Sequence, residues 1–498
     1  MVFEKLEPRI VWSIFENVFT KTPRESKKEE KIRAVLKKWI AEVSSSRSLN
    51  IEIKEDDSGN MLLRKPATPG FEKLPSVLLQ GHLDMVCETG RKGGFDFTNK
   101  AIPVRIQENG EWVDADGTTL GADNGMGMSL ALALMVDPEV KHGPLEILAT
   151  VDEETGLTGA FALQPKEIGI MSKLLINIDS EDLGIITIGS AGGGDTIFTK
   201  KIPKAKTAKN FAFRKISVTG LLGGHSGVDI HLHRGNANKI LARILATLID
   251  EVPIVICEWN GGGKRNAIPR DSTTVFGYPM KRSSNVEEIL KKAREEILAY
   301  YKADKAPLEP NLKIDWNETD SCDTFSPEES KKIIHTFHIL PHGPLRFSPA
   351  IEDLVETSNN VAVINTDDEG IHLQMSTRSN LDSELAAKRR ELAFIGEDMG
   401  WNVEQTRSYP GWAPDPTNTF LNFIREKYEE VLGSDIVVKA IHAGLECGIL
   451  GAGIPGLKMV SIGPTIKNPH SPDEKLKIED VGILYSFLKN VLRNLPKA

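Results

Sequence analysis

Cysteine and long apolar runs are both scarce in this chain of 498 residues. The longest apolar stretches, such as residues 129–136, are far too short to span a bilayer. The first residues, MVFEKLEPR, lack the apolar core of a signal peptide. The few cysteines are scattered without paired spacing, a pattern typical of a reducing cytoplasm; they are Cys87, Cys257, Cys322 and Cys447. We therefore expect a cytoplasmic protein that does not enter a membrane.

Runs of basic residues with interleaved aromatic residues are also missing. Their absence, with a formal net charge of −9 and a pI near 5.8, argues against nucleic-acid partners and anionic membrane surfaces. No GxGxxG or GxxxxGKS/T stretch follows an expected strand, so a nucleotide-binding α/β protein is a poor alternative. The 26% of charged and 40% of hydrophobic residues are those of an ordinary globular protein, whose length suggests two or three domains.

Short apolar runs with turn residues at their ends alternate with helical patterns. Residues 26–43 predict a helix, with Ser26 and Glu29 as a capping box and apolar residues along one face. Residues 130–136 predict a buried helix after a turn. Strands are expected at 76–80, 145–151, 173–178 and 456–463. This alternation favours an α/β fold with a doubly wound, mostly parallel sheet, in which ligands gather beyond the carboxyl ends of the strands.

A long interval between two candidate site segments predicts an inserted domain. Asp179 and His470 are 291 residues apart, which is room for an α+β domain with antiparallel strands. The glycine-rich stretch 189–194 is expected to be a hinge, and 407–416 the returning linker. We therefore predict a catalytic domain in two parts, 1–190 and 408–498, with an insertion at 191–407. Within the insertion, strands are expected at 213–219, 252–258, 272–278 and 311–316, helices at 236–249 and 285–302, and a strand–helix–strand group at 361–407.

Five segments carry metal-ligand side chains where buried strands should stop. They are LLQGHLDMV (78–86), LGADNG (120–125), ATVDEETG (149–156), LLINIDSED (174–182) and NPHSPDE (468–474). Two histidines and three carboxylates suit two divalent cations that share one carboxylate; the predicted ligands are His82, Asp123, Glu154, Asp179 and His470. Alone, each has an ordinary alternative, such as an Asx turn for Asp123, a solvated acidic turn at 152–154 or an exposed loop histidine at 470.

Two acids next to the predicted ligands are expected to orient a ligand and to transfer a proton rather than to bind metal. Asp84 lies two residues after His82, so both side chains leave a strand on the same side and Asp84 can orient the imidazole. Glu153 can take a proton from a water while Glu154 binds metal, because adjacent side chains diverge. Three carboxylates against two divalent ions leave a charge of +1, which favours a bridging hydroxide and a water pKa lowered toward about 7.

The motifs GHLDMV, GADNG, DEETG, NIDSE and NPHSPDE, with GGHSG (223–227), resemble the aminoacylase/carboxypeptidase clan of co-catalytic di-zinc hydrolases. HAGLECG (442–448) and the chain length are similar, more narrowly, to the aminoacyl-histidine (Xaa-His) dipeptidases. The resemblance implies the five zinc ligands above, with Asp123 bridging and Glu153 as the base. It also implies a cis peptide bond after Asp123, a lid inserted in a catalytic domain, and homodimers formed through the lid.

The same resemblance implies four contacts to a small peptide substrate. They are His225 of GGHSG, Asn266 of KRNAIP, Arg378 of STRSN and Gly444 of HAGLECG. Arg378 would bind the free carboxylate of a dipeptide, and His225 would stabilise the oxyanion once the lid closes, from its own or the partner's lid. Each residue has a simpler alternative, such as a turn for His225 and Asn266 or a surface charge for Arg378.

The reaction expected from these residues is hydrolysis of Xaa-His and related, carnosine-like dipeptides by a metal-bridging water that Glu153 activates. An N-acyl amino acid deacylase or a tripeptidase could use the same site. A non-catalytic binding or dimerisation module is a further alternative, although Glu153 would then have no reason to be present. Zinc is the expected metal, and cobalt or manganese could replace it at oxygen-rich ligands.

Overall fold

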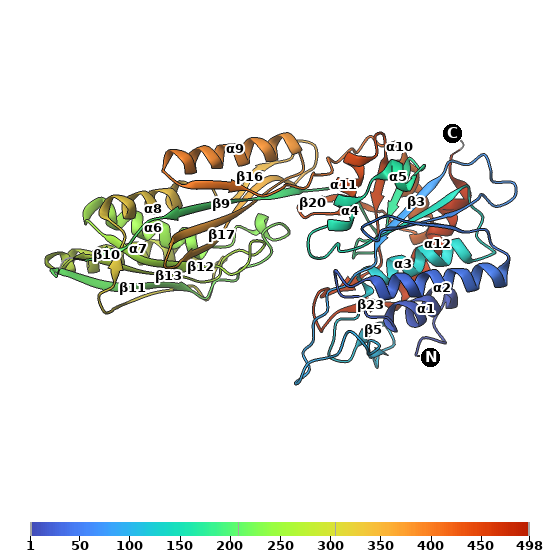
Figure 1. Ribbon diagram of the computed structural model, residues 1–498, viewed down its shortest axis with the longest axis horizontal. Coiled ribbons are helices and arrows are strands. Elements are labelled where there is room, and N and C mark those ends of the chain that lie inside the picture. Colours follow the sequence, from blue (N-terminus) through green and yellow to red (C-terminus); the bar gives the residue numbers. More distant parts are fainter. Residues whose placement is uncertain (1, 208, 304, 497–498) are drawn as a thin grey trace. The chain divides into compact units, whose positions relative to one another are not determined.

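The computed structural model describes residues 2–207, 209–303 and 305–496. The chain divides into two compact units, whose elements can be followed in Figure 1. The first unit comprises Met1–Gly189, Pro414–Ala440 and Leu445–Ala498, and the second comprises Ser190–Ala413 and Ile441–Gly444. The sequence predicted borders at 190/191 and 407/408, and it did not predict that the short segment 441–444 returns to the second unit.

The first unit is built on a mixed eight-stranded sheet. Its order is β1-β2-β6-β3-β7-β21-β8-β20, and the central strands β6, β3, β7 and β21 are parallel neighbours. β2 is antiparallel to β6, and β8 to β21. The bounds are β1 Glu52–Glu55, β2 Met61–Lys65, β3 Val77–His82, β6 Leu145–Thr150, β7 Leu174–Asn177, β8 Ile185–Ser190, β20 Val437–Ile441 and β21 Lys458–Ser461. β3 and β6 are buried along their whole length, which explains their nearly continuous apolar sequences.

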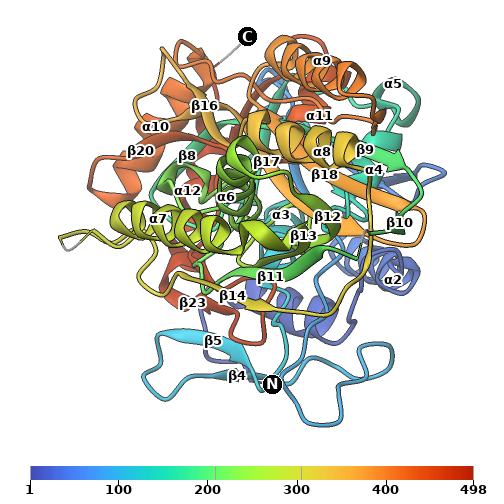
Figure 2. The ribbon, with the colours of Figure 1, turned by 90° about the vertical axis from the view of Figure 1, so that its left-hand side faces the viewer.

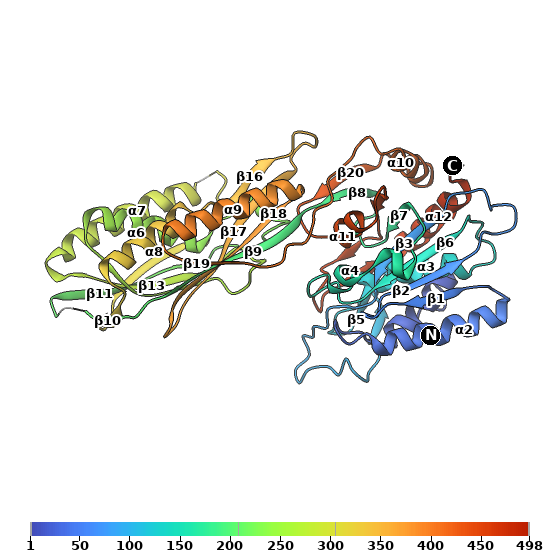
Figure 3. The same cartoon turned by 45° about the horizontal axis from the view of Figure 1, so that its top comes forward.

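Helix α3 (Ala122–Val136) is the central helix of this unit. It packs on β3 and β6, and α1 and α12 pack against it in turn. Figure 3 shows α3 close to β3 and β6. Every residue of α3 after Asp123 is buried, as expected for a helix in which nearly all residues from Gly125 onward are apolar.

The first unit also contains further helices and a small four-stranded sheet. The helices are α1 Arg9–Ile14, the π-helix η1 Phe15–Thr20, α2 Glu30–Arg47, α4 Thr158–Ala162, α5 Pro165–Ile168, α10 Thr419–Leu432, α11 Glu446–Gly453 and α12 Ile478–Asn494. The small sheet joins β22 Ile466–Lys467, β23 Lys475–Lys477, β5 Trp112–Ala115 and β4 Val104–Ile106.

The predicted capping box at the start of α2 is wrong. The helix begins at Glu30 and has no side-chain cap hydrogen bond. Ser26 instead donates to Asp84 Oδ2 at 2.7 Å, and Glu29 accepts the backbone N–H groups of Lys27 and Asp152. The two residues therefore support the turn after β6 and the acid beside His82, which a local capping pattern cannot indicate.

The second unit is an α+β domain on one antiparallel sheet of nine strands. The order is β14-β11-β13-β12-β17-β18-β9-β19, with β16 paired to β17, and a two-stranded sheet joins β10 and β15. The strands are β9 Gly192–Lys201, β10 Ala205–Lys206, β11 Phe211–Thr219, β12 Val255–Gly261, β13 Ser272–Pro279, β14 Lys313–Glu318, β15 Asp323–Thr324, β16 Gly343–Phe347, β17 Val355–Thr366, β18 Gly370–Ser379 and β19 Asn402–Gln405. The expected antiparallel α+β insertion is confirmed.

Four long helices pack on this sheet. α6 lies between α7 and α8, as Figure 2 shows, and α9 packs on β9, β18 and β19. An aromatic cluster forms part of the core, where Phe337 lies 4.9 Å from Trp259 and 5.7 Å from Trp401 between ring centroids. The bounds are α6 Ala237–Glu251, α7 Ser283–Tyr301, α8 Pro327–Ile339 and α9 Asp382–Asp398, with 3-10 turns η2 Ile230–Leu232 and η3 Met280–Arg282.

The glycine-rich stretch 189–194, which was expected to be a hinge, contains the border between the two units at Gly189 and Ser190. Apart from Ala191, its residues belong to β8 of the first sheet and to β9, which pairs with β18 and β19. A Cβ on Gly193 would lie 2.6 Å from the Tyr409 hydroxyl, and one on Gly194 would lie 2.7 Å from the Arg389 guanidinium carbon. These glycines are needed for close approach of other chain segments, a use that composition does not distinguish from flexibility.

The scattered spacing of the cysteines did not indicate that two of them pair in the fold. Cys257 on β12 and Cys322 form a disulfide in the second unit, with their Cα atoms 6.1 Å apart. They are 65 residues apart in the sequence, so only the fold brings them together. Cys87 and Cys447 are free thiols. In the part of the chain that the structure describes, no helix combines the length and apolarity needed to cross a membrane.

Candidate metal centre

The five predicted ligands come together at one edge of the sheet in the first unit. His82 ends β3, Glu154 lies four residues after β6, and Asp179 lies two residues after β7. Because β6, β3 and β7 are parallel neighbours, their carboxyl ends meet. Asp123 is in the first turn of α3, and His470 is in the loop between β22 and β23.

Asp123 lies between two histidines, one at each carboxylate oxygen. Its Oδ1 is 3.0 Å from His82 Nε2, and its Oδ2 is 3.1 Å from His470 Nε2. The His82 nitrogen is also 3.3 Å from Asp179 Oδ1, and the His470 nitrogen is 3.0 Å from Glu154 Oε2. The donors thus form two pairs, His82 with Asp179 and His470 with Glu154, and Asp123 is shared between them.

The donor chemistry and the unsatisfied atoms fit bound cations. Glu154 Oε1 and Asp179 Oδ1 are buried and have no hydrogen-bond partner among the residues that the structure describes. Burial and, to a lesser degree, the nearby Asp123 charge raise the pKa of Glu154 to about 7, although the hydrogen bond with His470 opposes them. Burial would lower the pKa of His470, but hydrogen bonds to Asp123 and Glu154 raise it to about 11. The side chains therefore form a site that needs positive charge, which two divalent ions would supply.

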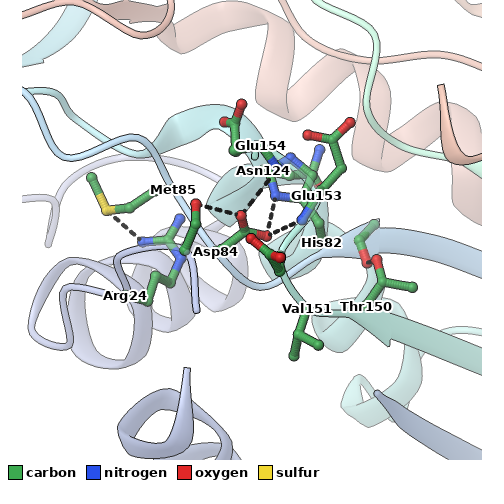
Figure 4. A network of polar contacts seen from close by, with 12 residues as sticks. Arg24, His82, Asp84, Met85, Asn124, Thr150, Val151, Glu153 and Glu154 are labelled. Carbon is green, nitrogen blue, oxygen red and sulfur yellow. Dashed lines mark hydrogen bonds and ion pairs between the residues drawn. The ribbon is translucent and has the colours of Figure 1, made fainter. Parts of the chain in front are cut away.

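Asp84 lies beside the Nδ1 atom of His82, on the side of the ring away from Nε2. Its Oδ1 is 3.3 Å from His82 Nδ1 and accepts the backbone N–H of Glu153 at 3.0 Å. Its Oδ2 accepts the backbone N–H of Glu154 at 3.2 Å and the Ser26 hydroxyl. Figure 4 shows Asp84 within this network. Burial would raise the pKa of Asp84, but the hydrogen bond and the charge of His82 outweigh burial and lower this pKa to about 2. Asp84 is therefore an anion, and an anion beside Nδ1 favours Nε2 of His82 as the atom that would bind a metal.

Glu153 is adjacent to the proposed ligands but belongs to neither pair. Burial raises its pKa well above the ordinary glutamate value, and the Asp179 and Glu154 carboxylates raise it further although His82 opposes them. A carboxyl group with a raised pKa can accept and return a proton near neutral pH. The two adjacent acids therefore differ in their surroundings, because Glu154 Oε2 is 3.0 Å from His470 Nε2 and Glu153 belongs to neither histidine–carboxylate pair.

The start of α3 is fixed by two buried residues that were not predicted. The Glu474 carboxylate, 2% exposed, accepts four successive backbone N–H groups, from Leu120, Gly121, Ala122 and Asp123, at 2.7–3.3 Å. Arg24 is completely buried and donates to the Gly121 carbonyl at 2.6 Å. Glu474 is part of the NPHSPDE motif and could have been singled out there; nothing near Arg24 in the sequence indicates its role.

The glycines of GADNG permit the close packing that was predicted for them. Gly121 has φ +69°, and a Cβ on Gly125 would lie 2.5 Å from Arg24 Nη2. The peptide bond between Asp123 and Asn124 is cis, as the family resemblance implied. Asn124 donates through Nδ2 to the Ile178 carbonyl at 2.6 Å, which connects the Asp123 turn with the segment before Asp179.

The predicted substrate residues all lie in the second unit, and short contacts connect them. The backbone N–H of Ser226, next to His225, donates to the Asn266 carbonyl at 2.8 Å. A Cβ on Gly227 would lie 3.1 Å from the His225 ring and 3.2 Å from Arg378 Nε. Arg378 donates to the Tyr409 hydroxyl at 2.8 Å, and a Cβ on Gly444 would lie 3.0 Å from the Tyr409 ring.

Two features of this group bear on substrate chemistry. Arg378 is 6% exposed, and its Nε has no hydrogen-bond partner in the described part of the chain. His225 Nδ1 accepts the backbone N–H groups of Gly227 and Val228 at 3.2 and 3.0 Å. A nitrogen that accepts two N–H groups carries no proton, so the His225 proton is on Nε2, where the ring can donate a hydrogen bond.

Comparison with known proteins connects this geometry to one family. Residues 78–494 match the model of peptidase family M20/M25/M40. The chain is 37% identical, over 99% of both proteins, to the cytosol non-specific dipeptidase of Escherichia coli K12. It is 36% identical to the aminoacylhistidine dipeptidase of Vibrio alginolyticus. The match to that crystal structure has a TM-score of 0.88 and covers 100% of this chain and 98% of the Vibrio chain. A tripeptidase from Staphylococcus aureus shares the fold at 15% identity and a TM-score of 0.55, over 98% of each chain.

Proposed function

Because this chain belongs to peptidase family M20/M25/M40 and is therefore a hydrolase of peptide bonds, we propose that it is a dipeptidase that uses two divalent metal ions. The shared position of Asp123 carries this proposal, since one carboxylate faces a histidine at each of its oxygens. His82 and Asp179 would hold one ion, and His470 and Glu154 the other. Zinc is the proposed metal, with cobalt or manganese as substitutes.

The protein side chains would transfer the proton and stabilise the negative charge that develops during the reaction. When bound, the ions would polarise the scissile carbonyl and acidify a water between them. Glu153 would take a proton from this water and return it to the leaving amine. His225 would donate its Nε2–H to the oxyanion, a role that the two N–H groups on its Nδ1 support.

The second unit would recognise the ends of a short substrate. The buried guanidinium of Arg378 would pair with the free carboxylate of the peptide, because a bidentate pair of this kind selects a terminal carboxylate. Asn266 and Gly444 would line the same recognition region. A carboxylate receptor at a set distance from the reacting carbonyl favours dipeptides over longer chains.

The proposed substrates are Xaa-His and related, carnosine-like dipeptides. The names of the Escherichia coli and Vibrio proteins support dipeptide substrates, and the Vibrio name supports the aminoacyl-histidine type. The name of the Escherichia coli protein also supports a cytoplasmic location. The second unit would act as a lid and form a homodimer interface, as the family resemblance implies.

One experiment tests the proposal against its nearest alternatives. Purified protein is assayed for bound metal, stripped with a chelator, and reloaded with zinc, cobalt or manganese. Each form is then given Xaa-His dipeptides, carnosine, tripeptides and acetylated amino acids. We expect about two metals per chain, loss of turnover on chelation, and faster hydrolysis of the dipeptides. Turnover that resists chelation would contradict the metal mechanism, and preference for acetylated amino acids or tripeptides would favour the sister activities.

A further inference from the structure

Glu446 is a buried acid that the proposed mechanism does not use. It is the first residue of α11 and is 0% exposed. Its Oε2 accepts hydrogen bonds from the Gln80 side-chain amide and the Thr150 hydroxyl, each at 2.6 Å. Its Oε1 is buried and has no hydrogen-bond partner among the described residues. Burying a carboxyl group costs free energy, and hydrogen bonds such as these two offset part of that cost.

A chain of hydrogen bonds runs from Glu446 across the sheet. Gln80 Oε1 accepts from Asn177 Nδ2 at 2.6 Å, and Asn177 Oδ1 accepts from the Ser461 hydroxyl. The Ser461 and Ser180 hydroxyls are 2.8 Å apart. Since Ser461 uses its only proton on Asn177, Ser180 is the donor in that last contact. Every donor thus points toward Glu446, which makes its carboxyl the final acceptor.

The chain crosses the strands that carry the proposed metal ligands. Asn177 on β7 pairs in register with Gln80 on β3 and with Ser461 on β21, and Thr150 ends the adjacent strand β6. His82 follows Gln80 by two residues, Asp179 follows Asn177 by two, and Glu154 follows Thr150 by four. One continuous row of buried polar side chains therefore lies just before three ligands from three strands.

We propose that Glu446 is a positioning residue for the metal centre: by accepting from Gln80 and Thr150 it fixes the ends of β3, β6 and β7, and so the spacing of His82, Glu154 and Asp179. This inference rests on the proposed two-metal function. Hydrogen bonds are stronger inside a protein than in water, so this buried row of hydrogen bonds restrains the side chains of Gln80, Thr150 and Asn177 in one arrangement. Loss of supporting contacts behind metal ligands typically weakens metal binding about 10- to 100-fold.

The test compares Glu446→Ala and Glu446→Gln with a matched control, which is another buried acid of the first unit. Glu146 on β6 is 1% exposed and accepts from Ser172, Met171 and Arg64, but it lies toward the amino end of the strand, away from the ligands. For each variant, zinc affinity of the folded, metal-free protein is measured by competition with a chromogenic chelator. Thermal unfolding of the metal-free form and kcat and KM for a dipeptide are recorded alongside.

We expect Glu446→Ala to bind zinc about 10- to 100-fold more weakly and to lower kcat with little change in KM. Glu446→Gln should recover most of the affinity, because its amide oxygen can still accept from Gln80 and Thr150. Thr150→Val, which removes one donor with little change in shape, should weaken zinc binding in the same direction, and it provides the test if Glu446→Ala does not fold. Glu146→Ala should lower the unfolding temperature without altering zinc affinity.

Three outcomes would overturn the inference. Glu446→Ala and Thr150→Val could bind zinc with wild-type affinity, or Glu146→Ala could weaken zinc binding equally, which would indicate a general effect of losing a buried acid. A wild-type protein that binds no metal would overturn both the inference and the proposed function. If the wild type binds zinc but cleaves no dipeptide, the proposed function fails while the zinc affinities still decide the role of Glu446.

Discussion

The carboxylate of Glu474 accepts the backbone N–H of Asp123 at 3.3 Å, although the two residues are 351 positions apart. Glu474 lies four residues after His470, so this contact fastens the loop that carries one proposed ligand to the turn that carries another. Three further backbone N–H groups donate to the same carboxylate. The distance between Asp123 and His470 therefore depends on a side chain that need not touch a metal.

Substitution of Glu474 should reduce both stability and metal binding. Glu474→Ala leaves four N–H groups at the start of α3 without their acceptor, and each buried donor left unsatisfied costs about 1–3 kcal/mol. We expect a lower free energy of unfolding for the metal-free protein, measured with denaturant, and loss of zinc in metal analysis. Glu72→Ala is the control, because its exposed carboxylate also accepts a backbone N–H, from Gly70. Equal effects from both variants would contradict a special role for Glu474.

The two adjacent acids Glu153 and Glu154 should have separable effects. Glu153→Ala should retain its metals and lose about 10²- to 10⁴-fold in kcat, the usual contribution of a general base. Glu154→Ala should lose metal, because its carboxylate faces His470 at 3.0 Å. Metal content by elemental analysis and kcat are measured on the same samples. If Glu153→Ala lost its metal and Glu154→Ala kept it, Glu153 would be the ligand and Glu154 the base, contrary to our assignment.

His225→Ala should separate turnover from metal binding. Removal of one hydrogen-bond donor to an oxyanion typically lowers kcat about 10²- to 10³-fold. Because His225 is in the second unit, we expect the metal content and the zinc affinity to remain those of the wild type. The exposed His233→Ala serves as the control. Unchanged kcat in His225→Ala would remove this residue from the mechanism.

Protonation of His142 should make stability depend on pH below neutrality. Burial, supported by the nearby Lys65 and Lys141 charges, lowers the pKa of His142 to about 4. Between pH 6.5 and 4 the unfolded chain binds a proton there and the folded chain does not, so stability falls as pH falls, by up to about 3 kcal/mol. His142→Gln should flatten this part of the pH profile of unfolding free energy, whereas the exposed His233→Gln should not. A profile with the wild-type slope in His142→Gln would contradict this account.

Local sequence patterns were sufficient where burial and chemistry occur in the same few residues. Apolar runs that end in His82, Glu154 or Asp179 predicted both the parallel strands and the edge at which the side chains meet. Such runs are informative because a buried strand cannot end in an acid without a partner. The glycines of GADNG likewise indicated close packing, and the structure shows Gly125 against Arg24.

Local patterns misled where a residue's partner is distant. Ser26 and Glu29 have the spacing of a capping box, yet their bonds go to Asp84 and to Asp152. Cys257 and Cys322 show no paired spacing, yet the fold of the second unit brings them within bonding distance. In each case the sequence carries the reactive group but says nothing of the chain segment that will face it.

By itself, then, the sequence determined the strand ends at which chemistry occurs and the identity of the candidate ligands, because these follow from periodicity and residue type. Its motifs also indicated the family, by resemblance. Only the tertiary structure decided that each oxygen of Asp123 faces a different histidine, that Glu474 joins two ligand segments, and that Glu446 accepts from two strands. The physical reason is that a hydrogen bond depends on distances of about 3 Å between atoms, and residues hundreds of positions apart acquire such distances only when the whole chain has folded.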